Sequence, residues 1–244
     1  PLPLLFLLLT FLPAQPEPPL RLLVFTQTDG YRHAAIPEAV AAMIRLGEER
    51  NWAVTVTEDS RFFEPQTLDR FDAVVFLYAL GDILDSRQQV ALQQFVEQGG
   101  GIATIHTGSL IETGWPWFND WVGATFTAHP PVQPGVLQVE DSTHPATAHL
   151  GETWAREDEW YSFDRNPRAQ VRVLLSLDEG SYDLEENPWF EGESLRMGDH
   201  PIAWCRSDRP GRLFHTALGH EARAYQDSLF VRHLIGGGEW AGKR

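Results

Sequence analysis

Residues 99–109, with the sequence GGGIATIHTGS, decide the fold of this chain. The glycines predict the end of a helix, and the β-branched residues that follow predict a short strand that turns sharply at His106. Ligands bind at the carboxyl ends of strands in open parallel sheets, so we expect the strand to be buried and His106 to be presented at the rim. The imidazole can act as a base, a metal ligand or a hydrogen-bonding group, although a histidine that merely fills a turn fits the pattern equally well.

Predicted strands and helices alternate on both sides of this elbow. The predicted strands are Arg21–Thr28, Trp52–Thr57, Ala73–Leu77, Gly135–Val139, Val171–Leu177 and Gly211–Ala217. Helices are predicted to begin at Pro37, Ser86 and Ser228. Ser86 and Gln89 resemble a capping box, and the helix from Ser228 to Leu234 is predicted to stop at glycines 236–238. This order predicts a single α/β domain with a doubly wound, mostly parallel sheet.

The composition excludes some classes of partner. The 244 residues include 19 Lys and Arg against 34 Asp and Glu, a formal charge of -15, which argues against binding to nucleic acid or to an anionic membrane surface. A neutral small molecule such as a carbohydrate fits better. The nine tryptophans are consistent with a sugar-facing cleft, although large aromatic residues more often fill cores.

The first 19 residues predict a signal peptide and a proline-rich spacer. The apolar run Leu2–Leu12 is too short to span a bilayer, and a segment with four prolines and a glutamate follows it. The chain starts with Pro1 rather than Met, so we expect the sequence to be incomplete at its start and to lack the basic region that normally precedes such a run. We expect a mature protein that begins between about Ala14 and Leu20 and is periplasmic or secreted, without stable membrane insertion. A retained membrane anchor is the alternative.

Three histidines are predicted to meet at one rim of the sheet. His33, His106 and His220 each follow a predicted strand, and parallel neighbours would bring their carboxyl ends together. We expect Glu159 to lie nearby, with an aromatic side chain such as Trp115 or Tyr161. The histidines could hold a divalent metal ion, although the tight ligand spacing of structural zinc sites is absent from the sequence. A structural role for each histidine stays open.

Two other features concern chemistry. Histidines precede proline at His129, His144 and His200, which fixes their direction and suits either a ligand or an ordinary turn. Glutamine amidotransferase chemistry needs a cysteine at the elbow, and this chain has histidine there. The single cysteine, Cys205, lies in an apolar, strand-like run that predicts an inert buried thiol, and it excludes an intramolecular disulfide.

Seven motifs between about Arg21 and Trp240 resemble the ThuA-like trehalose-utilisation family. They are Asp29–His33, Gly99–His106, Trp115–Phe118, His144–Thr147, Asp158–Tyr161, Asp199–Cys205 and Thr216–His220. The resemblance implies one domain over residues 20–242 with the flavodoxin-like fold of class I glutamine amidotransferases, in which His106 replaces the nucleophilic cysteine. It also implies a role in carbohydrate utilisation, often beside dehydrogenases that act through 3-keto sugars. Relatives carry an acid after the elbow where this chain has Leu110, which puts activity or specificity in doubt.

Two hypotheses follow from the residues and the resemblance. The first is an exported enzyme that acts on a disaccharide or its 3-keto derivative, with His106, His220 and Glu159 as catalytic groups. Its substrate-binding candidates are His33, Tyr31, Trp115, Tyr161 and His129. The cofactor is undetermined, and the metal-ligand candidates are His33, His106 and His220. The second hypothesis is a non-catalytic sugar-binding or scaffold protein on a retired amidotransferase fold.

Overall fold

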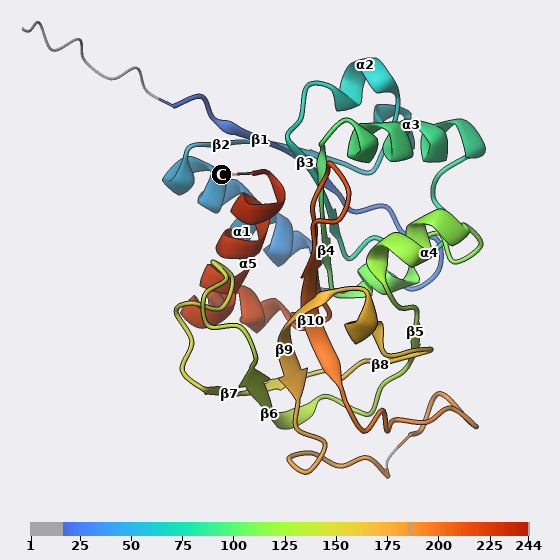
Figure 1. Ribbon diagram of the computed structural model, residues 1–244, viewed down its shortest axis with the longest axis vertical. Helices are drawn as coiled ribbons and strands as arrows, with labels where there is room; N and C mark the ends of the chain where they lie inside the picture. The colour runs from blue at the N-terminus through green and yellow to red at the C-terminus, as the bar shows by residue number, and fades with distance from the viewer. Residues whose placement is uncertain (1–16, 186, 244) are drawn as a thin grey trace, which may run out of the picture.

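A single nine-stranded sheet organises the chain in our computed structural model, which describes residues 17–185 and 187–243 (Figure 1). The predicted signal segment Leu2–Leu12 lies outside these residues. The strands are β1 (Leu20–Phe25), β2 (Trp52–Thr57), β3 (Ala73–Leu77), β4 (Gly101–Ile105), β5 (Phe126–Ala128), β6 (Gln133–Val139), β7 (Thr153–Asp158), β8 (Ser162–Phe163), β9 (Arg172–Leu177), β10 (Pro201–Arg206) and β11 (Leu213–Thr216). Of these, β5 and β8 form a separate two-stranded sheet.

Helices connect most of the parallel strands. The α-helices are α1 (Ile36–Arg50), α2 (Pro65–Leu68), α3 (Ser86–Glu97), α4 (Pro116–Val122) and α5 (Ser228–Ala241). Short 3₁₀ helices span Ser60–Phe62, Thr107–Leu110, Pro167–Ala169 and Ala222–Gln226. No helix in the described part of the chain combines the length and the apolar character needed to cross a membrane.

The first half of the sheet is parallel. Its strands lie in the order β2-β1-β3-β4-β11, and each pairs with its neighbours in the same direction. Helices α1 and α5 cover one face, while α2, α3 and α4 cover the other, as Figure 1 shows. All residues of β3 and β4 are buried, because both faces of these strands are covered. This arrangement confirms the predicted doubly wound α/β class.

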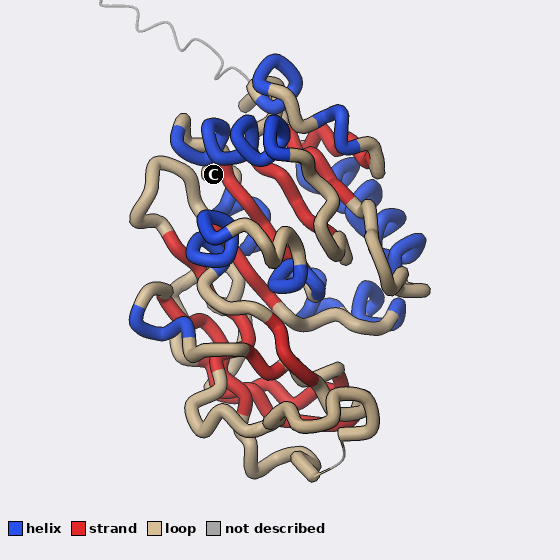
Figure 2. The backbone as a smooth tube through the Cα atoms, turned by 90° about the vertical axis from the view of Figure 1, so that its right-hand side faces the viewer, coloured by secondary structure: helices blue, strands red, loops and turns tan. Residues whose placement is uncertain are grey.

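The second half of the sheet is antiparallel. Strand β10 pairs antiparallel with β11, and β9, β6 and β7 continue outward in the same manner. Figure 2 shows this extension continuing the sheet below the helical layers. Sequence patterns predict the strands at β6, β9 and β10 but not β5, β7 or β8. The short β5 and β8 have too few residues for a period to emerge.

Several predicted boundaries are wrong for identifiable reasons. The capping box of α3 uses Asp85 and Gln88, one residue before the predicted pair, since Asp85 accepts hydrogen bonds from the amides of Arg87 and Gln88. Helix α5 continues through the glycines that were expected to end it. A Cβ atom at Gly237 would lie 2.3 Å from the Phe214 ring, so this glycine permits close packing rather than a helix end.

The tryptophan-rich segment after the elbow also differs from expectation. Residues Pro116–Val122 form α4, with proline in the first turn, where its missing amide costs nothing. The sequence pattern predicts an irregular, proline-broken stretch instead.

The predicted adjacency of the strands also needs correction. Strand β3 separates β1 from β4, whereas β4 and β11 are direct neighbours.

Candidate functional site

His106 occupies a strained turn directly after β4. Its backbone has φ 62° and ψ -99°, a combination that residues other than glycine rarely adopt. Gly108 makes the turn sterically feasible, since a Cβ atom there would lie 2.1 Å from the Cβ of Thr104. The amide of His106 donates to the carbonyl of Thr216 on β11, 2.8 Å away, which ties the elbow to the neighbouring strand.

The ring of His106 has a fixed orientation. The side chain is fully buried, and its Nδ1 lies 2.9 Å from the carbonyl oxygen of Ala217. A carbonyl oxygen can only accept, so Nδ1 carries the proton that makes this bond. In the neutral ring Nε2 therefore bears a lone pair, which is directed away from the sheet toward the other candidate residues. This is the orientation expected of a metal ligand or a base.

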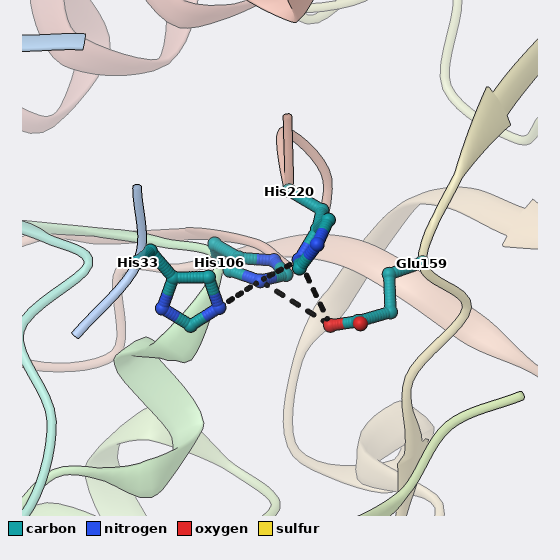
Figure 3. A group of neighbouring side chains, drawn as sticks. All are labelled: His33, His106, Glu159 and His220. Atoms are coloured by element: carbon teal, nitrogen blue, oxygen red, sulfur yellow. Dashed lines mark hydrogen bonds and ion pairs between the residues drawn. The ribbon is translucent and has the colours of Figure 1, made fainter. Parts of the chain in front are cut away.

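Three side chains from distant segments converge on this lone pair (Figure 3). The Nε2 of His33, in the loop between β1 and α1, lies 3.1 Å from His106 Nε2. The Nδ1 of His220, in the loop after β11, lies 3.2 Å from the same atom. Glu159, directly after β7, brings Oε2 to 3.5 Å from His106 Nε2 and to 3.2 Å from His220 Nδ1. The four ligand atoms lie within 4.8 Å of one another.

The polar groups around His106 Nε2 are too numerous for all of them to hydrogen-bond to it. The hydroxyl of Tyr161 also lies 3.0 Å from His106 Nε2, so four polar groups surround an atom with one lone pair. Tetrahedral coordination with metal–nitrogen bonds of 2.0–2.1 Å separates the ligand atoms by about 3.3 Å, close to the four separations of 3.1–3.5 Å given above. Three imidazoles and one carboxylate are a donor set that suits a divalent transition metal. The residues therefore fit a metal ion.

The pKa values of His33, Glu159 and His220 are shifted by burial and by their neighbours. Burial, together with the nearby His106 and His220, lowers the pKa of His33 to about 3, so its ring is neutral near pH 7. Burial alone would raise the pKa of Glu159, but its contacts with His106 and His220 outweigh burial and lower it below the usual range. Burial acts to lower the pKa of His220, and the carboxylate of Glu159 raises it overall. An ionised carboxylate and neutral imidazoles are the forms that bind metals, so Glu159 and His33 are already in the ligand form, whereas His220 would release a proton when an ion binds.

Asp158 supports the site from beneath. Its carboxylate accepts hydrogen bonds from the amides of Gly219 at 2.9 Å, His220 at 3.0 Å and Glu159 at 2.9 Å. The buried guanidinium of Arg156 lies 2.7 Å from the same carboxylate. Asp158 thus holds together the two loops that carry His220 and Glu159.

His129 and Tyr161 complete the polar surroundings. The Nδ1 of His129 lies 3.2 Å from Oε1 of Glu159, whereas the other oxygen of this carboxylate, Oε2, faces His106. The same Nδ1 lies 2.9 Å from the carbonyl oxygen of Pro130. Burial lowers the pKa of the His129 ring. Burial also raises the pKa of the Tyr161 hydroxyl well above its usual value, and the Nε2 of His200 donates to the Tyr161 carbonyl at 2.8 Å. Tyr161 therefore keeps its proton and a fixed position.

A cavity of about 580 Å³ opens directly above this group. Its lining residues are Tyr31, His33, Leu80, Thr107, Leu110, Phe126, His129, Val132, Glu159, Tyr161, Trp189, Phe190 and His220. Tyr31 lies at the mouth with 64% of its surface exposed, and its ring meets His33 edge-on at 4.7 Å. Seven of the eight candidate residues are thus in or next to one cavity.

Trp115 is the exception. Its ring stacks on Trp117 at 5.0 Å and on Phe118, and it packs against the core cluster between the sheet and helices α3 and α4. The sequence predicts an aromatic side chain such as Trp115 or Tyr161 beside the histidines, and the structure places Tyr161 there. Trp115 is the N-cap residue of helix α4 in the helical layer.

Sequence reasoning missed several residues near the site. Tyr78 follows β3 with φ 53°, and its ring centre lies 5.4 Å from that of His106. The rule that found the histidines, namely a polar residue after a buried strand, would have found Tyr78 too. Trp189 and Phe190 lie in a long loop without periodicity, so no comparable signal identifies them.

Comparison with known proteins agrees with this architecture. The family model ThuA, described as trehalose utilisation, matches residues 21–241. A ThuA-like protein from Bacteroides uniformis is similar with a TM-score of 0.78 and 24% identity over 95% of each chain. One from Parabacteroides merdae has a TM-score of 0.72 and 21% identity over 92% of this chain and 90% of that one.

More distant structures share the fold alone. A protein from Thermoplasma acidophilum that is described as a GMP synthase component has a TM-score of 0.52 and 12% identity, over 93% of this chain and 95% of that one. No curated protein matches the chain.

Proposed function

Since this chain belongs to the ThuA family, we propose that it serves carbohydrate utilisation by binding a sugar at a divalent transition metal and acting on it there. The metal ligands in this proposal are His33, His106, Glu159 and His220. The observation that carries it is the convergence of four ligand atoms within 4.8 Å beside a cavity large enough for a sugar. When bound, such an ion acts as a Lewis acid toward a hydroxyl or keto oxygen.

The remaining polar residues have separate tasks in this proposal. The protonated Tyr161 hydroxyl donates a hydrogen bond to the bound sugar or to a group that develops negative charge. His129 carries its proton on Nδ1, next to Glu159 and the Pro130 carbonyl, so its Nε2 can accept a proton from a sugar hydroxyl or carbon. Asp158 keeps His220 and Glu159 in place. Tyr31 covers one side of the sugar at the mouth.

Metal binding is the first test. We expect purified protein dialysed against Zn²⁺ or Mn²⁺ to retain about one ion per chain by elemental analysis. His106→Ala and Glu159→Gln should each weaken metal affinity by at least about a hundredfold in calorimetric titration, since even residues behind the ligands are worth about 10–100-fold. His149→Ala, which removes a histidine far from the cluster, is the matched control and should bind like the unaltered protein. Equal affinity in all variants would contradict the proposal.

Turnover separates an enzyme from a sugar-binding protein. Metal-loaded protein is incubated with trehalose and with its 3-keto derivative, and products are followed by chromatography. An enzyme should lose turnover in the His129→Ala variant while sugar affinity changes little. Sugar binding without any product would favour the non-catalytic alternative on the same site.

We also propose that this activity is located outside the cytoplasm. The support is the apolar run Leu2–Leu12 and the prolines that follow it. Amino-terminal sequencing of protein recovered from the culture medium or periplasm should give a start between about Ala14 and Leu20. An intact Leu2–Leu12 segment in a membrane fraction would instead identify an anchor.

A further inference from the structure

The residues that line the cavity beside the four candidate ligands fall into two unlike groups, apart from Tyr31 and His129. One group is polar and consists of His33, Thr107, Glu159, Tyr161 and His220. The other group is apolar or aromatic and consists of Leu80, Leu110, Phe126, Val132, Trp189 and Phe190. We refer to these two groups as the polar floor and the apolar wall. The volume of about 580 Å³ is larger than one hexose ring needs and lies in the range of pockets that take drug-sized ligands.

The apolar wall is poorly suited to a second sugar ring. The side chains of Leu80, Leu110 and Val132 offer neither a hydrogen-bond donor nor an acceptor. A sugar ring has hydroxyl groups around its whole edge, and each one that leaves water without a new partner costs free energy. An apolar group placed there would gain free energy by leaving water.

The aromatic members of the wall pack together with His129. Phe190 meets Phe126 edge-on with ring centres 5.4 Å apart, and the His129 ring contacts the rings of Phe126, Phe190 and Trp189. Two hydrogen bonds between Asn187 and the backbone of Phe190 fix the loop at this point. Trp189 nevertheless leaves 60% of its surface exposed at the cavity mouth. A large aromatic side chain that is exposed beside a cavity is a typical ligand contact.

We propose that the ligand is a glycoside with an apolar, aromatic non-sugar part rather than a disaccharide. The sugar lies on the polar floor and the non-sugar part packs against the apolar wall. This inference rests on the proposed function, because the polar floor contains the metal ligands that place the sugar. It goes beyond that function by naming the chemical class of the group attached to the sugar.

The test compares ligands that differ only in this group. Zn²⁺-loaded protein is titrated calorimetrically with methyl and phenyl D-glucopyranosides, both anomers of each, and with α,α-trehalose. For the anomer that binds, we expect the phenyl glucoside to have a Kd at least about tenfold lower than the methyl glucoside, since burying a phenyl ring in an apolar pocket gives that much or more. Trehalose should bind within about threefold of the methyl glucoside.

Variants locate the effect on the apolar wall. Leu110→Asp and Phe190→Ala should each reduce the phenyl preference to less than about threefold, because one introduces a charge and the other removes a contact surface. Val90→Asp, which introduces the same charge at an exposed position on α3, should keep the full preference. Two wall variants are used so that a folding defect in one does not decide the result, and metal content serves as the check on folding.

The outcomes separate this inference from the proposed function. If trehalose binds about tenfold tighter than the phenyl glucosides, the inference fails while metal-dependent sugar binding stands. A phenyl preference that persists in both wall variants also overturns it. If no glucoside binds to the metal-loaded protein, the sugar part of the proposed function fails, and the inference fails with it.

Discussion

The parallel half of the sheet and its antiparallel extension contribute different kinds of residue to the site. The parallel half supplies His33, His106 and His220, each in the segment that follows a buried strand. The extension and its loops supply Glu159, Tyr161 and His129, together with the aromatic wall of the cavity. Three of the proposed ligands therefore follow from one topological rule, whereas the fourth and the pocket depend on how the extension folds back over the strand ends.

Asp158 is where the two regions are joined, so changing it should have the largest effect. Asp158→Asn removes the charge that faces buried Arg156, and breaking a buried ion pair costs about 3–5 kcal/mol of folding free energy. We expect that loss in urea unfolding, and also weaker metal binding, because His220 and Glu159 lose their common support. Asp69→Asn, at an exposed position after α2, should change stability by less than about 0.5 kcal/mol. Similar stability of the two variants would mean that the regions do not depend on this residue.

The elbow tests the parallel half alone. Gly108→Ala places a methyl group against Thr104, and we expect a loss of about 2–3 kcal/mol because the buried turn cannot expand. Gly114→Ala is the matched control, since a Cβ atom there meets nothing within 4 Å. Thermal unfolding followed by circular dichroism measures both variants. Equal melting temperatures would show that the strained turn is not needed to place His106.

The labelling rate of Cys205 tests whether the antiparallel extension opens on its own, and it is the smallest of the expected effects. It lies on β10, the first antiparallel strand, and burial raises the pKa of its thiol to about 12. At pH 8 the thiol is therefore almost entirely protonated and unreactive. We expect labelling by a disulfide reagent only as fast as global unfolding. Faster labelling under native conditions would show that the extension opens independently of the parallel half.

The same division explains what the sequence could predict. Strands β2 and β3 were predicted at their observed boundaries. In β3 the signal is the continuous apolar run of a buried parallel strand, whereas β2 is an edge strand, mostly half-buried, whose signal is its β-branched residues. The meeting of His33, His106 and His220 follows from their places after such strands. Trp115 was expected beside the histidines, but its sequence does not show which layer the segment after the elbow joins. The positions of Trp189 and Phe190 depend on loop packing, which leaves no periodic trace in the sequence.

The central claim is that His33, His106, Glu159 and His220 hold one metal ion at the carboxyl edge of the sheet. Crystals of the Zn²⁺-loaded protein, measured on both sides of the zinc absorption edge, test this claim directly. We predict one strong anomalous peak with Nε2 of His33, Nε2 of His106, Nδ1 of His220 and a Glu159 oxygen at about 2.0–2.2 Å. An anomalous peak elsewhere, or none at these four residues, would contradict the account.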